Sequence, residues 1–168
     1  MSSRDLLVTI TFGLILGGCA QAPPATIPDK SAADEKAIND AITTAMDDFN
    51  KKDFDKFVDE FYTDDAYWLM PNAPLLNGKA AMRDVMKGAS NDPNFSFDSQ
   101  TTKVVASKAG DFGYAQGTAT QTWTDPKTKK VMMTKDKWVT VFRQQNDGSM
   151  RAVADMFNAD GPPVVATK

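Results

Sequence analysis

The chain has 168 residues, a formal net charge of −3 and 10% aromatic residues, which suits a single globular domain. Its acidic balance and scattered basic residues argue against nucleic-acid binding, which needs a concentrated basic patch. The absence of histidine excludes Ser-His-Asp and Cys-His catalysis and every zinc site that contains histidine. The single cysteine, Cys19, excludes an intramolecular disulfide.

The N-terminal segment has the pattern of an export signal. An apolar run of signal-peptide length, too short to cross a bilayer comfortably, ends in Leu16-Gly17-Gly18-Cys19. This ending resembles a bacterial lipobox, in which the cysteine is lipidated after cleavage before it. We therefore predict a signal peptide at residues 1–18, lipidation of Cys19 and an extended, proline-rich linker at residues 19–31.

These features predict a location in the cell envelope. The protein would be exported and periplasmic, and would contact the membrane through its lipid anchor only. The residue after the cysteine, Ala20, resembles the sorting signal for the outer membrane. The alternative is ordinary secretory cleavage after Ala20 or Ala22, which would release a soluble periplasmic or secreted protein.

Amphipathic helices dominate the first half of the domain. The first is predicted to begin at Ser31-Ala32-Ala33-Asp34, which resembles a capping box. The second follows Asp53, a plausible N-cap, and the third covers residues 79–87. Between the last two, a polar break precedes a short apolar strand at residues 66–70.

Strands dominate the second half, where the apolar period changes to two. Asp147-Gly148 is a strong hairpin signal, and the tail at residues 161–168 is expected to be loose. Helices followed by strands predict an α+β fold, with helices on one face of an antiparallel sheet. The predicted strands are residues 95–106, 112–124, 131–145 and 150–158.

Several short motifs occur in a specific order. They are Tyr62-Thr63-Asp64-Asp65-Ala66, Met70-Pro71, Asn77-Gly78-Lys79, Ala115-Gln116-Gly117-Thr118, and a closing Val153-Ala154-Asp155-Met156-Phe157-Asn158 after the hairpin. In this order they resemble the nuclear transport factor 2-like superfamily, in its SnoaL-like branch. The resemblance implies that residues 32–160 form a cone, in which a curved antiparallel or mixed sheet wraps around three N-terminal helices.

The resemblance also implies an apolar pocket in the open end of the cone, and often a homodimer formed through the sheet. The threonine-rich strand around Thr118 to Thr122 is a candidate for that dimer surface. Because the superfamily contains enzymes, binding domains and assembly domains, the fold does not decide the function. Ketosteroid isomerase has a tyrosine donor where this chain has Ala45, and a general-base aspartate where this chain has Met70. A thioether cannot accept a proton, which argues against that chemistry.

Two aspartates are the candidate catalytic residues. Asp155 lies in an apolar strand, where a carboxylate needs partners or a raised pKa. By resemblance, Val153, Asp155 and Phe157 face the cavity, and an aspartate on this strand acts as acid or base in polyketide cyclases. The alternative is an outward-facing, ion-paired Asp155. Asp136 matches the second polar pocket position beside Trp138, although its two flanking lysines favour a solvated charge cluster.

The predicted pocket wall contains aromatic and apolar residues that core packing would explain equally well. Trp68 shares a strand face with Met70, and Tyr62 offers a hydroxyl group to a ligand. We expect no metal site, because consecutive acidic residues near a helix end are usually solvated, and no cofactor. The complete predicted ligand-pocket set is Tyr62, Trp68, Met70, Trp138, Val153 and Phe157.

The preferred prediction is an envelope-tethered domain that binds a small apolar molecule. One alternative is an isomerase, cyclase or dehydratase that uses Asp155 as general acid or base. Another is a non-catalytic assembly module whose own side chains fill the pocket. The sequence leaves open whether any reaction is catalysed. A cavity of about 300 Å³ or more would favour binding or catalysis over assembly.

Overall fold

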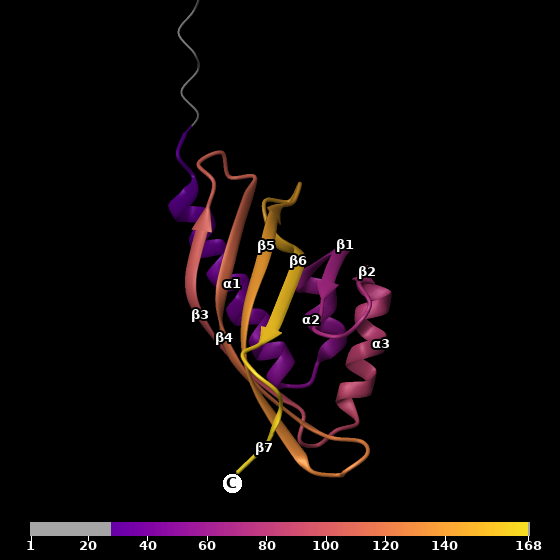
Figure 1. The fold of residues 1–168 in the computed structure, drawn as a ribbon. Coiled ribbons are helices and arrows are strands. Elements are labelled where there is room, and N and C mark those ends of the chain that lie inside the picture. Colours follow the sequence, from indigo (N-terminus) through magenta and orange to yellow (C-terminus); the bar gives the residue numbers. More distant parts are fainter. Residues whose placement is uncertain (1–27, 168) are drawn as a thin grey trace, which may run out of the picture.

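The computed structural model describes residues 28–167. The predicted signal peptide, Cys19 and most of the linker lie outside the described residues. Among the described residues, no helix is long and apolar enough to cross a membrane. The elements follow one another in the order α1 Ser31–Asn50, α2 Phe54–Phe61, β1 Tyr62–Leu69, β2 Leu76–Asn77, α3 Gly78–Ser90, β3 Ser96–Ala106, β4 Phe112–Thr124, β5 Val131–Gln144, β6 Met150–Ala159 and β7 Val164–Val165 (Figure 1).

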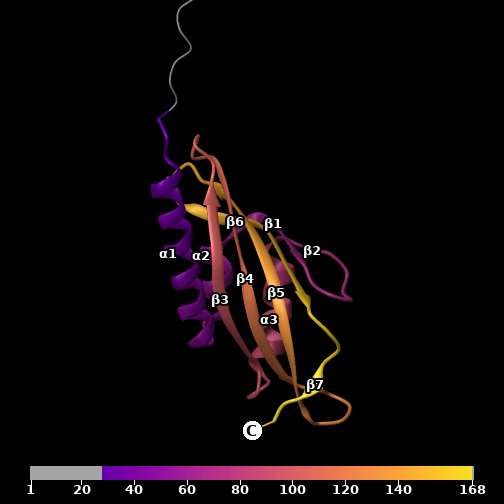
Figure 2. The same cartoon turned by 60° about the vertical axis from the view of Figure 1, so that its left-hand side comes forward.

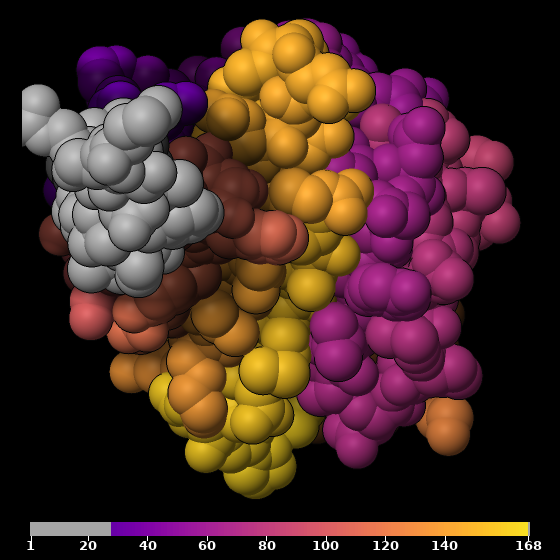
Figure 3. Space-filling view, turned by 90° about the horizontal axis from the view of Figure 1, so that it is seen from above, coloured from indigo at the N-terminus to yellow at the C-terminus, as the bar shows by residue number. Residues whose placement is uncertain are grey.

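The strands form one mixed sheet in the order β2-β1-β6-β5-β4-β3, and β7 pairs with β5. The β1–β6 pair is parallel, whereas the other pairs are antiparallel. In Figure 3 the orange and yellow atoms of the β5–β6 region lie beside the magenta atoms of the segment that contains β1, as this pairing requires. The three helices cover one face of the sheet, and the long strands β4 and β5 bend along their length (Figure 2). The predicted α+β cone is confirmed.

Small residues on the inner face of β4 let α1 pack closely against the sheet. Ala115, Gly117 and Ala119 alternate along this face and are buried. At Gly113 a Cβ atom would lie only 2.5 Å from the Cδ1 atom of Ile38 on α1, a separation that real Cβ contacts do not show. The absence of a side chain at Gly113 therefore leaves room for α1 against the sheet, and α1 forms one wall of the space between the two layers.

Three local expectations were wrong. Ser31 is not an N-cap: Lys30 occupies that position without a side-chain cap, and Ser31 instead donates to the Asp29 carboxylate. The polar break before the first strand is itself strand, because β1 begins at Tyr62 and pairs there with Ala152. The tail also contains a strand, since β7 pairs with Met132 and Met133 of β5.

Other local predictions were correct. Asp53 caps α2 by accepting a hydrogen bond from the backbone N–H of Lys56 at 3.3 Å. Gly148 has the positive φ of 84° that the β5–β6 turn requires. The buried face of α2 then brings its aromatic side chains onto the start of β1, where the rings of Phe61 and Tyr62 meet edge-to-face with centroids 4.9 Å apart.

Candidate functional site

An apolar pocket lies between the helices and the inner face of the sheet. Its cavity volume is about 140 Å³, below the roughly 300 Å³ typical of a ligand site, so volume alone favours the alternative of an assembly module. All three helices and strands β1, β3, β4, β5 and β6 contribute to its wall. The apolar lining residues are Ile42, Met46, Phe49, Phe57, Phe61, Val85, Met86, Ala89, Phe95 and Phe97, together with the predicted residues described next.

The structure brings most of the predicted pocket residues together. Tyr62, Trp68, Met70, Trp138 and Phe157 all line the cavity. Tyr62 and Trp68 lie on β1, Met70 directly follows it, and the other two residues lie on β5 and β6. Strand pairing rather than proximity in the sequence therefore brings them together. Asp155 lines the same cavity.

Val153, the sixth predicted residue, is not among the lining residues, and a β-bulge explains why. Phe142 pairs with Ala152, but the next residue of β5, Val141, pairs with Ala154. Val153 is therefore the extra residue of β6. Ala152 is fully buried and faces the core, and the bulge restores Asp155 and Phe157 to that same inner face. Strict alternation along β6 would have turned either Ala152 or Asp155 outward.

Asp155 is the centre of a polar cluster on the pocket wall. Its Oδ2 atom accepts a hydrogen bond from the Tyr62 hydroxyl at 2.6 Å, and its Oδ1 atom accepts one from the Thr140 hydroxyl at 2.9 Å. Among the described residues, no lysine or arginine lines this pocket. The alternative of an outward-facing, ion-paired Asp155 is therefore wrong: both partners are neutral hydroxyl groups.

The surroundings shift the pKa of both acidic groups in the cluster upward. Burial raises the pKa of Asp155 above its ordinary value of 3.8, although the Tyr62 and Thr140 hydrogen bonds oppose this shift. Burial and the neighbouring Asp155 charge raise the pKa of Tyr62 well above 10.0. Tyr62 consequently stays neutral and donates, while Asp155 is the group that exchanges a proton most readily in this pocket.

The two tryptophans of the pocket differ in how their indole N–H groups are used. Trp138 donates to the backbone carbonyl of Thr118 at 3.2 Å. Trp68 is only 7% exposed, and its buried Nε1 atom has no hydrogen-bond partner in the described part of the chain. The indole faces Asp155 and Tyr62 and lowers the pKa of both as a weak donor, but its N–H makes no hydrogen bond of normal geometry to either group. Most buried polar groups are satisfied, so this free donor needs an explanation.

Asp136 is not at the pocket, although it lies on the same strand face as Trp138. It is 2% exposed and accepts a hydrogen bond from the Thr134 hydroxyl at 3.2 Å, so the expected solvated charge cluster is wrong. Burial raises its pKa above the ordinary 3.8. Asp136 borders a different, more open hollow with Asp98 and Asp160, and it does not line the pocket that contains Asp155.

Thr140 is the member of the polar cluster that the sequence did not reveal. It is paired directly with Asp155 across β5 and β6, but counting back from the hairpin turn without the bulge would pair it with Ala154. Its position two residues after Trp138 on the same strand face was the available signal. Ala45, at the position of the isomerase tyrosine, is buried in the core, and Tyr62 approaches the pocket from β1 instead.

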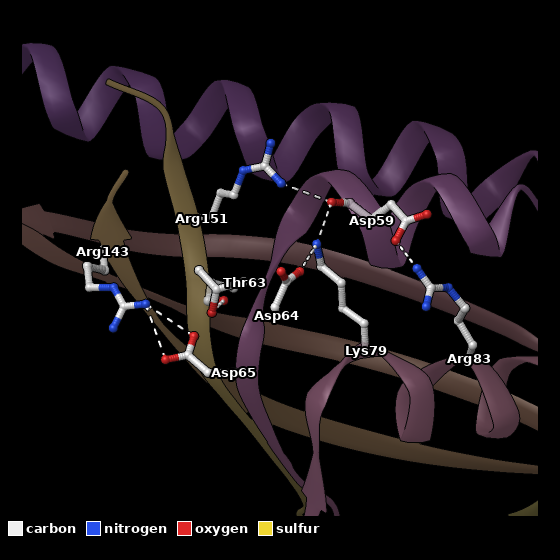
Figure 4. A network of polar contacts seen from close by, with 9 residues as sticks. Asp59, Thr63, Asp64, Asp65, Lys79, Arg83, Arg143 and Arg151 are labelled. Carbon is white, nitrogen blue, oxygen red and sulfur yellow. Dashed lines mark hydrogen bonds and ion pairs between the residues drawn. The ribbon is translucent and has the colours of Figure 1, made fainter. Parts of the chain in front are cut away.

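A second polar cluster lies outside the pocket, where β1 meets α2, α3 and β6 (Figure 4). We call it the outer ion-pair network. Lys79 contacts the Asp64 carboxylate at 2.9 Å and donates to the carbonyl of Asp59 at 3.0 Å, and Arg143 contacts Asp65 at 3.1 Å. Its members are Asp59, Asp64, Asp65, Lys79, Arg83, Arg143 and Arg151.

The SnoaL-like domain family matches residues 42–154, most of the described chain. The chain belongs to this family. Its fold is also that of a nuclear transport factor 2-like superfamily protein from Salmonella enterica, which aligns with a TM-score of 0.63 and 12% identity over 78% of this chain and 94% of that one, as the sequence predicted. No curated protein matches it by sequence.

Solved structures share the fold of this SnoaL-like domain. A ketosteroid isomerase-like protein from Erwinia carotovora atroseptica aligns with a TM-score of 0.67 and 21% identity, over 77% of this chain and 98% of that one. The hexachlorocyclohexane dehydrochlorinase LinA-type3 from Novosphingobium barchaimii aligns with a TM-score of 0.67 and 12% identity, over 81% and 93%. At these identities the similarity establishes the fold alone.

Proposed function

We propose that this SnoaL-like domain binds a small apolar molecule in the pocket around Asp155. The observation that carries the proposal is a cavity with apolar walls and one polar cluster, formed by Asp155, Tyr62 and Thr140. A ligand site combines these features: an apolar wall supplies affinity, and a few polar groups fix orientation.

The cavity volume limits the size of the ligand. About 140 Å³ is close to the roughly 150 Å³ of an engineered apolar cavity in another protein that binds benzene. It is too small for a fused-ring molecule of steroid size. We therefore propose a ligand about the size of one six-membered ring.

The test is a titration of the purified domain with toluene, followed by tryptophan fluorescence, since Trp68 and Trp138 both line the cavity. We expect saturable binding with a Kd of about 1 mM or tighter. Ala89→Phe places a ring in the cavity wall and should abolish binding. Ala80→Phe, an exposed position on the same helix, should leave binding unchanged. Absence of saturable binding by the wild-type protein would refute the proposal and favour an assembly module.

A second candidate function is catalysis by Asp155 as general acid or base. The observation that favours it is the raised pKa of Asp155 beside the Tyr62 donor, because a shifted carboxyl group in a pocket is typical of acid–base catalysts. For an enzyme, Asp155→Asn should lower the rate about 100-fold while binding survives. For a binding domain, the same change should alter affinity by only about 0.5–1.5 kcal/mol.

We further propose that the domain is tethered in the cell envelope through Cys19, on the strength of the lipobox-like segment and the proline-rich linker. Labelling of cells with a radioactive fatty acid tests this tether, and Cys19→Ser is the control. Unlabelled wild-type protein would support ordinary secretion instead. Formation of a homodimer also remains a proposal, which light scattering of the purified domain tests.

A further inference from the structure

The pocket contains one hydrogen-bond donor, the Trp68 indole, that faces Asp155 and Tyr62 but makes no hydrogen bond of normal geometry within the described residues. Trp68 is buried and lines the cavity, and its Nε1 atom has no acceptor within residues 28–167. The matched case, Trp138, lines the same cavity but already donates to the Thr118 carbonyl. A buried N–H without an acceptor costs about 1–3 kcal/mol, and a ligand acceptor at this point would remove that cost.

The same wall contains an acceptor with spare capacity. A carboxylate has about four lone-pair sites, and Asp155 receives one hydrogen bond at each oxygen, from Tyr62 and from Thr140. Both of those hydroxyl groups are neutral, so the carboxylate has no charged partner on the pocket wall. A further donor from a ligand would stabilise the ionised form, which burial now disfavours.

We propose that the ligand is a ring-sized apolar molecule with one hydroxyl group, which donates to Asp155 and accepts from the Trp68 indole. This inference rests on the proposed function and specifies its ligand class. A hydroxyl group is both donor and acceptor, so one such group can accept from the Trp68 N–H and donate to the Asp155 carboxylate. The remaining wall is apolar and suits the ring.

Other polar groups fit the same wall less well. A hydrocarbon leaves the Trp68 N–H unpaired. An aldehyde or ketone accepts from the indole but offers no donor to Asp155. A carboxylate ligand would face the Asp155 charge in a pocket without a cation on its described wall, and like charges at short range repel strongly in a poorly solvated site.

The experiment measures the affinity of the purified domain for four ring-sized probes: phenol, toluene, benzaldehyde and benzoate. We expect phenol to bind tenfold or more tightly than toluene at neutral pH, benzaldehyde to lie between them and benzoate not to bind. Equal affinities for phenol and toluene would overturn the inference and leave the proposed function intact. Failure of all four probes to bind would refute both.

Two matched variants separate the roles of the two indoles. Trp68→Phe should reduce the preference for phenol over toluene to about threefold or less. Trp138→Phe, which removes an indole whose N–H is already used, should leave the preference at tenfold or more. If both variants lose the preference equally, or neither does, the assignment to Trp68 is wrong.

A measurement on the wild-type protein covers the case in which a variant does not fold. In a ¹⁵N–¹H spectrum, phenol should shift the Trp68 indole N–H signal downfield, because the proton enters a hydrogen bond. Toluene should not produce this shift, and the Trp138 signal should change little with either probe. A Trp68 signal that responds identically to both probes would contradict the proposed contact.

Discussion

The molecule holds two sets of aspartates on neighbouring strands, and they differ in their partners. In the pocket, Asp155 accepts hydrogen bonds from the neutral hydroxyl groups of Tyr62 and Thr140. In the outer ion-pair network, Asp64 and Asp65 contact Lys79 and Arg143 (Figure 4). Their pKa values move in opposite directions from the same ordinary value of 3.8, upward for Asp155 and downward for the outer pair.

The pKa values differ because of exposure to solvent as much as because of the hydrogen-bond partners. Burial is the largest effect on Asp155 and raises its pKa. For Asp64 the largest effect is the hydrogen bond from Lys79, and for Asp65 it is the Thr63 hydroxyl, with Arg143 adding to it. The cations thus neutralise charge where water already screens it, whereas the half-buried carboxyl group of Asp155 has only neutral hydroxyl groups as hydrogen-bond partners on Tyr62 and Thr140. Under the proposed function, the outer ion-pair network contributes to stability and the pocket cluster to binding.

The largest expected effect comes from the packing that shapes the pocket wall. In Gly117→Ala, the new Cβ atom would overlap the carbonyl oxygen of Gln100 and lie 2.6 Å from Cζ2 of Trp138. Because β3 and Trp138 must both move, the free energy of unfolding should fall by about 2–3 kcal/mol in urea denaturation. Gly88→Ala on α3, where nothing lies within 4 Å, should be neutral or slightly stabilising. Equal effects of the two changes would show that the wall is not tightly packed.

The change in the free energy of unfolding with pH is expected to be intermediate in size. The folded-state pKa of Asp155 is raised, so between the ordinary value and the raised value the folded state binds more protons than the unfolded state. Stability therefore falls as pH rises through this window and is then constant. Asp155→Asn lacks the titrating group. The stability of the wild-type protein relative to Asp155→Asn should thus decrease as pH rises above the ordinary pKa of 3.8 and should level off above the raised pKa of Asp155. A relative stability that increases with pH would mean that Asp155 is stabilised as the anion.

The smallest effect is expected in the outer ion-pair network. Asp65 and Arg143 are largely exposed, and exposed pairs contribute about 0–1 kcal/mol. Asp65→Asn should lower the free energy of unfolding by less than about 1 kcal/mol. This contribution should disappear as pH falls through the lowered pKa of Asp65, and high salt should reduce it. A loss larger than that of Gly117→Ala would reverse the proposed division between the two clusters.

The sequence alone determined the layers of this fold, because the relevant signals are local. Apolar residues at helical spacing in α2, alternation in β4 and the Asp147-Gly148 turn act over a few residues of chain. The three helices and the five longer strands appeared within a few residues of their predicted bounds, whereas the two-residue strands β2 and β7 were not predicted. The same alternation was enough to identify Trp68 and Met70 as neighbours on one face of the first strand, and both line the pocket.

Only the tertiary structure decided which polar groups meet. The bulge at Val153 shifts the β5–β6 register by one residue, and this shift pairs Asp155 with Thr140 and excludes Val153 from the pocket. The parallel pairing of β1 with β6 brings Tyr62 within 2.6 Å of an aspartate far along the chain. Neither feature has a local signature, because a bulge and a parallel pairing are settled by packing between segments distant in sequence. The hydrogen bonds that set the chemistry of the pocket depend on both.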